Sequence, residues 1–380
     1  MKWELKTIND LCKIKGGKRL PKNHELVEDK TSHPYIRARD IGNGIIDFSK
    51  PVYLQDSTFN FISTYTVKQD DIVLTIVGAN IGDVGLIPKE LDGANLTENA
   101  VKLTSFNDNC YFKYLLYYFL LPGKKKQLEQ VAAGSAQGKL GLYKIKDIAI
   151  PIPQIFIQLK ITSILSAYDD LIENNVKRIK LLEEKAKLHY KELMQESAKW
   201  DKVRLEDFVS VVKGKKPKNV LEQPEDDSQL YLLLDTVERT KTLYTSDLTL
   251  PLSKETDVLM CMDGARSGLA FRGMVGAIGS TMAIWRSNSE RVSGEFLFQF
   301  MKQNESAITQ GNTGAAIPHS NRKFILDMKI AIPPKKEAVN FDKLTNPIIK
   351  LVNTLHNQNT KLREARDILL PRLMSGQIKV

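Results

Sequence analysis

Cysteine and long apolar runs are both scarce in this chain of 380 residues. Cys12, Cys110 and Cys261 are far apart and form no C-x-x-C pair, which argues against a disulfide framework or a zinc site and predicts small core residues. No apolar stretch approaches the roughly 20 residues that a membrane-spanning helix needs. The opening Met-Lys-Trp-Glu-Leu-Lys is not followed by an apolar segment, so we expect no secretory signal and a cytoplasmic protein.

Motifs that carry catalysis are also missing. The chain has no G-x-x-x-x-G-K-[ST] phosphate loop, no H-E-x-x-H helix, no G-x-S-x-G elbow and no Asn/Asp-Pro-Pro-aromatic tetrapeptide of amino-methyltransferases. The histidines are dispersed and unpaired with any cysteine: His24, His33, His189, His319 and His356. We therefore expect no catalytic residue, no metal site and no cofactor in this chain.

Size and charge favour two soluble domains with an anionic partner. A chain of 380 residues exceeds what one hydrophobic core usually organises, and 42% hydrophobic with 26% charged residues is typical of globular proteins. The formal net charge is +10, from 55 basic and 45 acidic residues, and the pI is about 9.2. This balance favours nucleic acid as a partner, although many basic proteins bind none.

The main positive feature is a long apolar seam that occurs twice, 183 positions apart, with steps of four and three residues. The first copy is Ile161, Leu165, Tyr168, Ile172, Asn175, Ile179, Leu182 and Ala186. The second copy is Leu344, Ile348, Leu351, Leu355, Gln358, Leu362, Ala365 and Leu369. A one-sided seam of this period is buried against another helix, and the obvious candidate is its own copy. We expect antiparallel pairing, because a parallel pair would need one domain to span the whole length of the helices.

Within the seam, Asn175 and Gln358 are predicted to face each other and fix the register, the alternative being that both amides lie at a solvent edge. The first helix, from 155 to 196, would be a rod of roughly 60 Å if continuous. Pro347 and Pro371 interrupt the pattern of the second helix and predict a separate first turn and a kinked last turn, and Gly376 offers a C-terminal cap.

The rest of the chain repeats as well. Each half opens with Trp, an apolar pair and a glycine-lysine step ending in Pro-Lys-Asn, at 3–23 and 200–219. Strands are predicted around Tyr35 and Tyr231, followed by β-branched runs entering glycine turns, 71–82 and 257–268. Helix-like runs at 111–121 and 295–301, glycine-polar loops at 134–139 and 311–316, and strands that run into proline complete each copy. The predicted fold is α+β with four segments: domains at 1–152 and 198–333, and spacer helices at 153–197 and 334–380.

Basic and amide side chains in the repeated loops are the candidate nucleic-acid contacts. In the first copy they are Lys18, Arg19, Lys22, Arg37, Arg39, Asn80, Gln137 and Lys139. In the second copy they are Lys215, Lys216, Lys218, Arg266, Asn312 and Arg322. Lysine and arginine suit phosphates, whereas amides and guanidiniums suit base edges. The plainer reading is that the basic clusters are solvated loops and that the glycine turn at 78–82 is a tight turn rather than an anion-binding nest.

Taken in order, these segments resemble the specificity subunit of Type I restriction-modification enzymes along the whole chain. The likeness lies in the Gly-Lys-Arg step, Pro34-Tyr-Ile-Arg-Ala-Arg-Asp-Ile with Gly44, Asp71 through Gly82, Gly134-Ser-Ala-Gln, Ile150-Pro-Ile-Pro with Gln158, and the terminal 369–378 segment. The second copy departs from the pattern, with Leu233 and Leu234 in place of Arg37 and Ala38. Such a difference is expected of two domains that read different sequences.

The resemblance implies two target-recognition domains, each reading half of a bipartite duplex DNA site, with an antiparallel helical spacer that sets the gap. It implies that S-adenosylmethionine and adenine methylation belong to two separate modification subunits, and that restriction subunits join them. This chain would then choose the site without catalysing a reaction. The alternatives are a self-sufficient DNA methyltransferase or nuclease, or a scaffold that binds proteins instead of DNA.

Overall fold

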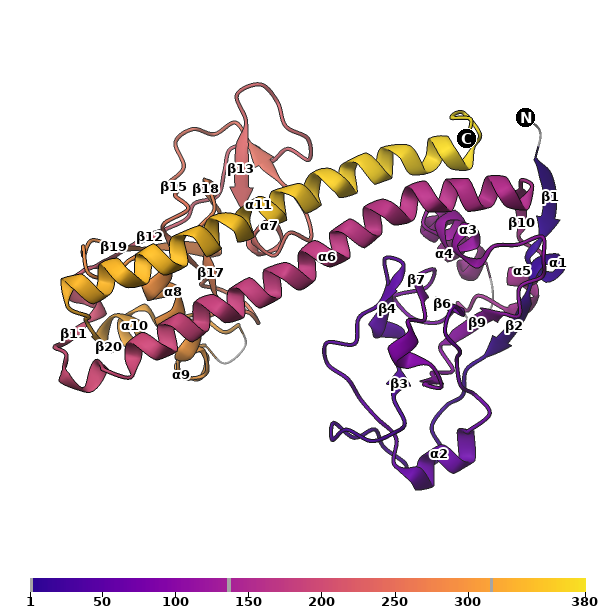
Figure 1. The fold of residues 1–380 in the computed structure, drawn as a ribbon, viewed down its shortest axis with the longest axis horizontal. Coiled ribbons are helices and arrows are strands. Elements are labelled where there is room, and N and C mark those ends of the chain that lie inside the picture. The colour runs from indigo at the N-terminus through magenta and orange to yellow at the C-terminus, as the bar shows by residue number, and fades with distance from the viewer. Residues whose placement is uncertain (1–2, 135–137, 315–316) are drawn as a thin grey trace. The chain divides into compact units, whose positions relative to one another are not determined.

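The computed structural model describes residues 3–134, 138–314 and 317–380. The chain divides into two compact units, each made of one mixed α/β domain and part of each long helix (Figure 1). Unit 1 comprises Met1–Asn174 and Gln358–Val380, and unit 2 comprises Asn175–Asn357. No helix in the described ranges is long and apolar enough to cross a membrane.

Unit 1 is built on a four-stranded antiparallel sheet. Its strands in spatial order are β2 (Lys13–Gly16), β9 (Ala100–Thr104), β6 (Ile72–Thr75) and β7 (Val84–Leu86). The apolar run of β6 is wholly buried, and the aromatic helix α3 (Phe112–Phe119) adds the fully buried Tyr114 to the same core. The other elements of the domain are β1 (Glu4–Thr7), α1 (Ile8–Leu11), β3 (Tyr35–Ile36), η1 (Ala38–Asp40), β4 (Ile41–Gly42), β5 (Ile45–Ile46), α2 (Asp56–Ile62), η2 (Lys89–Leu91), β8 (Asn95–Leu96), α4 (Lys124–Ala133), α5 (Leu142–Lys146) and β10 (Ala149–Ile152).

Unit 2 repeats this architecture. Its antiparallel sheet has the order β12 (Val209–Lys213), β19 (Met282–Ser287), β16 (Val258–Cys261) and β17 (Ala270–Arg272). Helix α8 (Gly294–Gln303) occupies the place of α3 and buries Phe296 beside the fully buried Trp285. The remaining elements are η3 (Ser197–Lys199), β11 (Lys202–Arg204), η4 (Leu205–Asp207), β13 (Gln229–Leu232), α7 (Leu234–Val237), β14 (Tyr244–Thr245), β15 (Leu252–Ser253), β18 (Gly276–Ile278), α9 (Glu305–Gln310), α10 (Arg322–Asp327) and β20 (Lys329–Ala331).

Strand pairing outside the central sheets confirms the predicted repeat. In both domains the first strand pairs antiparallel with the last strand before the proline, β1 with β10 and β11 with β20. A parallel pair also recurs, β3 with β8 and β13 with β18. The two halves therefore share a fold as well as a sequence pattern, and both are α+β as predicted.

The long helices α6 (Ile155–Met194) and α11 (Lys335–Met374) pair antiparallel within each unit. In unit 1, Arg366 Nη1 lies 2.6 Å from Asp169 Oδ1, and Asn359 Nδ2 donates to Ile172 O at 3.5 Å, so partner numbers fall along α11 as they rise along α6. In unit 2 the paired segments share one apolar cluster: Ile179, Leu182, Ala186, Ile348, Ile349, Val352 and Leu355.

The seam of α6 lies where the sequence places it, but the seam of α11 is partly different. Ile161, Leu165, Asn175, Ile179 and Ala186 are buried, and Tyr168, Ile172 and Leu182 are half-buried. On α11, Ile348 and Leu355 are buried, and Leu362, Ala365 and Leu369 are half-buried. Leu344, Leu351 and Gln358 instead lie exposed, and their expected places are taken by the buried Thr345, Val352 and Asn359.

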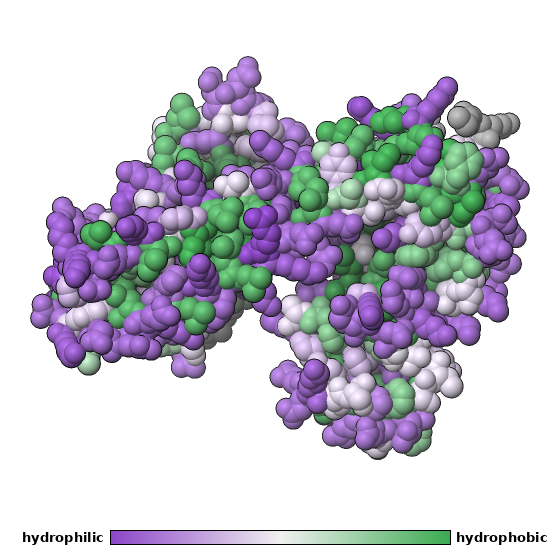
Figure 2. Space-filling view, viewed as in Figure 1, coloured by the Kyte–Doolittle hydropathy of each residue, from purple (hydrophilic) through white to green (hydrophobic). Residues whose placement is uncertain are grey.

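The change of buried stripe on α11 has a physical cause. Leu344 and Thr345, or Gln358 and Asn359, are about 100° apart around the helix, so two neighbouring stripes share Ile348 and Leu355. The buried stripe runs through Thr345, whose hydroxyl donates to Phe341 O at 2.9 Å and so carries no unmet polar group into the seam. Its counterpart 183 positions earlier, Thr162, donates to Gln158 O at 2.8 Å. Figure 2 shows apolar side chains (green) left at the surface of the helix pair in unit 2.

The predicted separate first turn before Pro347 is wrong, because α11 is continuous from Lys335 to Met374. A proline removes one helical hydrogen bond, but here packing on both sides of each proline holds the helix together. Gly376 does cap the helix: it has a φ of +74°, and Ile378 N donates to Arg372 O at 3.2 Å.

Each domain is attached to its helix segment by a buried polar group. In unit 1, Tyr117 Oη of α3 donates to Asp169 Oδ2 at 2.6 Å. Burial is the main cause that raises the pKa of this tyrosine, and the nearby Asp169 carboxylate raises it further. In unit 2, Arg272 of β17 bridges Glu295 of α8 and Glu183 of α6, each at 2.7 Å. The chemistry differs between the copies, but the connection between domain and helix is kept.

Candidate nucleic-acid interface

The basic opening segment of unit 1 follows β2 and crosses close to the backbone at Leu96–Thr97. A Cβ on Gly17 would lie 2.0 Å from Thr97 O, so only glycine fits there. Beyond it, Lys18 Nζ lies 5.4 Å from the centre of the Tyr65 ring, and Arg19 Nε donates to Glu98 at 3.0 Å. The Lys18, Arg19 and Lys22 side chains are all exposed.

Glu98 balances part of this positive charge. Burial raises the pKa of Glu98, but hydrogen bonds, with that from Arg19 the strongest, outweigh burial and lower it overall. The carboxylate is therefore ionised at neutral pH and holds Arg19 along the loop, with the Arg19 side chain 82% exposed.

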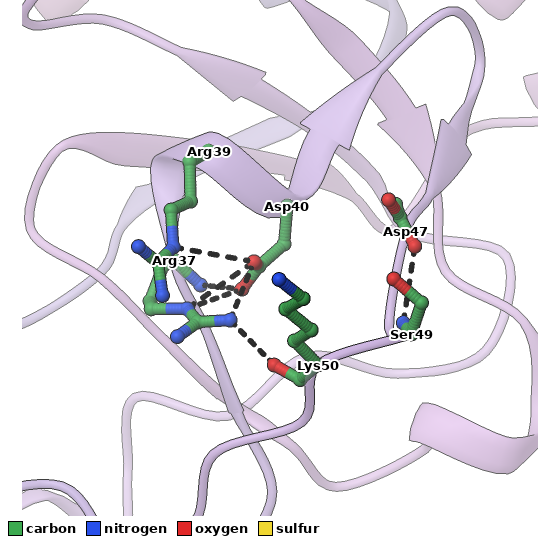
Figure 3. Close-up of polar contacts among 6 residues, drawn as sticks. All are labelled: Arg37, Arg39, Asp40, Asp47, Ser49 and Lys50. Atoms are coloured by element: carbon green, nitrogen blue, oxygen red, sulfur yellow. Dashed lines mark hydrogen bonds and ion pairs between the residues drawn. The ribbon is translucent and has the colours of Figure 1, made fainter. Parts of the chain in front are cut away.

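The Arg37–Asp40 turn separates two arginines that look alike in sequence (Figure 3). The Asp40 carboxylate accepts from Arg37 Nε at 2.9 Å and from Nη2 at 2.8 Å, and Nη2 also donates to Lys50 O at 2.7 Å. The strand expected through this segment stops at Ile36, because Asp40 also accepts from Arg37 N and closes a short 3-10 turn. Arg37 thus holds the turn, whereas the Arg39 side chain is 69% exposed.

Two glycine loops have matching backbone hydrogen bonds in the two domains. In unit 1, Gly82 N donates to Thr75 O and Asp83 N to Asn80 O, both near 3.0 Å. In unit 2, Gly268 N donates to Cys261 O at 2.8 Å and Leu269 N to Arg266 O at 3.2 Å. Since each donor and acceptor is displaced by 186 positions, Asn80 and Arg266 occupy the same place in the two loops.

A second loop lies against each glycine loop, and here the structure corrects the alignment. Leu140 N donates to Ile76 O at 3.0 Å, and Ser320 N donates to Met262 O at 2.8 Å. Ile76 and Met262 are equivalent, so Lys139 matches His319 rather than a residue nearer Gly311. From Gly311 to Ser320 this loop of unit 2 is three residues longer than the matching segment of unit 1, from Gly134 to Leu140. Comparison of the sequences alone could not resolve this difference.

The other predicted residues of unit 2 lie as follows. Lys215, Lys216 and Lys218 are exposed after Gly214, whose Cβ would lie 2.0 Å from Gly279 O, as at Gly17. Arg266 is ion-paired with Glu238. Asn312 Nδ2 donates to Ser267 Oγ at 2.7 Å and joins the two loops, and Arg322 is exposed at the start of α10. Gln137 lies outside the described residues.

Sequence reasoning missed the pair formed by His319 and Asp263, whose side chains meet at 2.7 Å between the two loops of unit 2. Lys213 Nζ lies 3.9 Å from the other Asp263 oxygen. The only signal in the sequence was an isolated histidine. Across the described ranges, no group of three or more His, Cys, Asp or Glu residues could hold a metal ion.

Comparisons with known proteins agree with this architecture. Residues 1–184 match the family model of the Type I restriction modification DNA specificity domain. The MjaX specificity subunit assigned to a type I restriction enzyme of Methanocaldococcus jannaschii is 24% identical, over all of this chain and 94% of that protein. The MjaIX specificity subunit of the same organism is 23% identical, over all of this chain and 94% of that protein.

Among solved structures, the crystal structure of the Type-I restriction-modification system S subunit from M. genitalium has a TM-score of 0.62. It covers 98% of this chain and 96% of that one, at 15% identity, and so shows the same fold. With its duplicated domains and its antiparallel helices, the chain is similar along its whole length to the DNA specificity subunits of Type I restriction-modification enzymes.

Proposed function

We propose that this chain chooses the DNA site of its enzyme by reading two half-sites, one with each globular domain, and that the paired helices set the gap between them. The observation that carries the proposal is one loop framework present in both units with different side chains on it, Asn80 and Lys139 in one and Arg266 and His319 in the other. A shared framework with changed side chains is what reading two different sequences requires.

The two kinds of contact have separate roles. The exposed basic segments after Gly17 and Gly214 supply phosphate contacts, which give affinity that falls with salt. Side chains on the paired glycine loops supply base contacts, which give discrimination. Arg39 is the exposed guanidinium at the Arg37–Asp40 turn and contributes to the first group.

Partners supply the chemistry. Two modification subunits dock where the helices meet the domains, carry S-adenosylmethionine and methylate adenine, and restriction subunits join the complex in the cytoplasm. This chain catalyses no step. The similarity to specificity subunits does not favour a self-sufficient methyltransferase or nuclease, or a protein-binding scaffold.

The test is to sequence methylated adenines in cells that carry this chain with its modification subunits. We expect a bipartite motif, and replacing residues 198–333 with the matching domain of a relative is expected to change one half and leave the other half and the gap unchanged. A chimera with both halves changed would contradict the modular reading.

Salt dependence tests the phosphate contacts separately. Replacing Lys18, Arg19 and Lys22 by alanine is expected to make the negative slope of log K against log salt shallower, by about 0.9 for each phosphate that is no longer neutralised. Lys199→Ala, which removes an exposed lysine paired with Glu196 beyond α6, is the matched control and is expected to leave the slope unchanged.

A further inference from the structure

We infer that His319, oriented by Asp263, is a specificity-determining residue of the second domain and accepts a hydrogen bond from the exocyclic amine of an adenine or cytosine. The inference rests on the proposed function, because it names one base contact within a half-site.

The His319 ring is oriented by Asp263 on one side and is exposed to solvent on the other. Its Nδ1 lies 2.7 Å from Asp263 Oδ1, and its side chain is 52% exposed. Its backbone is fixed as well, since Thr313 N donates to His319 O at 2.9 Å and His319 N donates to Thr313 O at 2.7 Å. The ring therefore has a defined direction and a free edge.

The partner fixes the tautomer. An ionised carboxylate only accepts hydrogen bonds, so in the neutral imidazole the proton lies on Nδ1 and Nε2 keeps its lone pair. In the major groove, the hydrogen-bond donors on base edges are the N6 amine of adenine and the N4 amine of cytosine. The oriented Nε2 thus suits these two bases and cannot serve guanine or thymine, which present acceptors there.

The fold does not need this pair for stability. The two loops are already joined by backbone bonds, Gly264 N to Pro318 O at 2.9 Å and Ser320 N to Met262 O at 2.8 Å. Exposed ion pairs contribute little to folding. The plainer role, a loop staple, is thus already filled by the backbone.

Comparison of the two copies points to specificity. His319 is equivalent to Lys139, and Asp263, which is 186 positions after Val77, is equivalent to that apolar residue. The first domain therefore presents valine and lysine where the second presents aspartate and histidine. The hydrogen bonds within the glycine loop, and the bond from the second loop to Ile76 or Met262, recur in both copies. The change of side chains therefore affects what the loops can contact within a shared framework.

The first experiment compares methylation motifs from complexes carrying the wild-type chain, H319A, H319Q or D263A. H319A is expected to lose discrimination at one position of one half-site, with the other half and the gap unchanged. H319Q keeps an acceptor of similar reach and is expected to retain the preference. His189→Ala, which removes another histidine paired with a carboxylate, is the control and is expected to leave the motif unchanged.

Asp263 acts through His319 and is a positioning residue. D263A is expected to relax the same position as H319A, whereas D263N keeps an oxygen that can accept from Nδ1 and is expected to restore the preference. Relaxation at a different position, or no rescue by asparagine, would contradict this role.

The second experiment identifies the base with the purified wild-type complex. Purine replaces adenine, and 2-pyrimidinone replaces cytosine, at each position of the half-site, so that one amine is removed at a time. Binding is expected to weaken about tenfold at one position. The same substitution is expected to cost H319A much less.

Each outcome decides something. No bipartite motif from the wild-type complex would sink the proposed function itself. A bipartite motif that is identical in H319A would overturn the role of His319 alone. If H319A does not assemble, the wild-type series decides, because a half-site with no amine-sensitive position also overturns the inference.

Discussion

Removing Arg272 is expected to destabilise unit 2 strongly, because it leaves a buried carboxylate without its charge partner. Arg272 Nε and Nη2 donate to the two oxygens of Glu295 at 2.7 and 3.0 Å, and the Glu295 side chain is 6% exposed. Burial by itself lowers the pKa of Arg272, but the hydrogen bonds and charges of Glu295 and Glu183 outweigh it and raise that pKa overall. The arginine therefore stays charged at every accessible pH.

The magnitude follows from this geometry. Breaking a buried ion pair by removing one partner costs about 3–5 kcal/mol. Gln299 Nε2 still donates to Glu295 at 2.7 Å, so Arg272→Met is expected near the lower end, about 3 kcal/mol. That is a large part of the roughly 5–15 kcal/mol that holds a typical domain folded.

Urea unfolding of the full chain, followed by fluorescence, measures this loss. Trp285 is fully buried in unit 2, and replacing Trp3 and Trp200 by phenylalanine makes it the reporter. The double variant R272M/E295L is expected to recover most of the loss, because it removes the uncompensated charge. A loss below about 1 kcal/mol in R272M, the range of exposed pairs, or no recovery in the double variant, would refute the reasoning.

Three further predictions concern single sites. Gly17→Ala is expected to destabilise unit 1, because its Cβ would lie 2.0 Å from a carbonyl oxygen. Gly16→Ala is the control, because its Cβ would meet no atom within 4 Å. Equal urea midpoints for the two variants would contradict the prediction. Burial raises the pKa of Asp342 and outweighs its hydrogen bond with Ser293, so Asp342→Asn is expected to raise the urea midpoint at pH 7. This gain should vanish as the pH falls through the raised pKa of the folded state toward the pKa of the unfolded state, near 4. A lower midpoint for the variant at pH 7 would contradict the prediction. Burial raises the pKa of Cys12 and Cys110 to about 12, so mass spectrometry is expected to find neither alkylated by iodoacetamide at pH 8 until urea is added.

The sequence by itself determined the repeat, the long helices and the mixed character of both domains. These features depend on local periodicity and on similarity between segments, which are visible in one dimension. The α6 seam from Ile161 to Ala186 could be read for this reason, as could the helices around Tyr114 and Phe296.

Only the tertiary structure decided which side chains face outward. Thr345 rather than Leu344 lies in the seam because the choice between neighbouring stripes depends on the partner helix. Arg37 is held by Asp40 while Arg39 is exposed, although the two look alike in sequence. His319 takes the place of Lys139 because a backbone bond between loops far apart in the chain sets that register, and loop length hides it from any comparison of sequence alone.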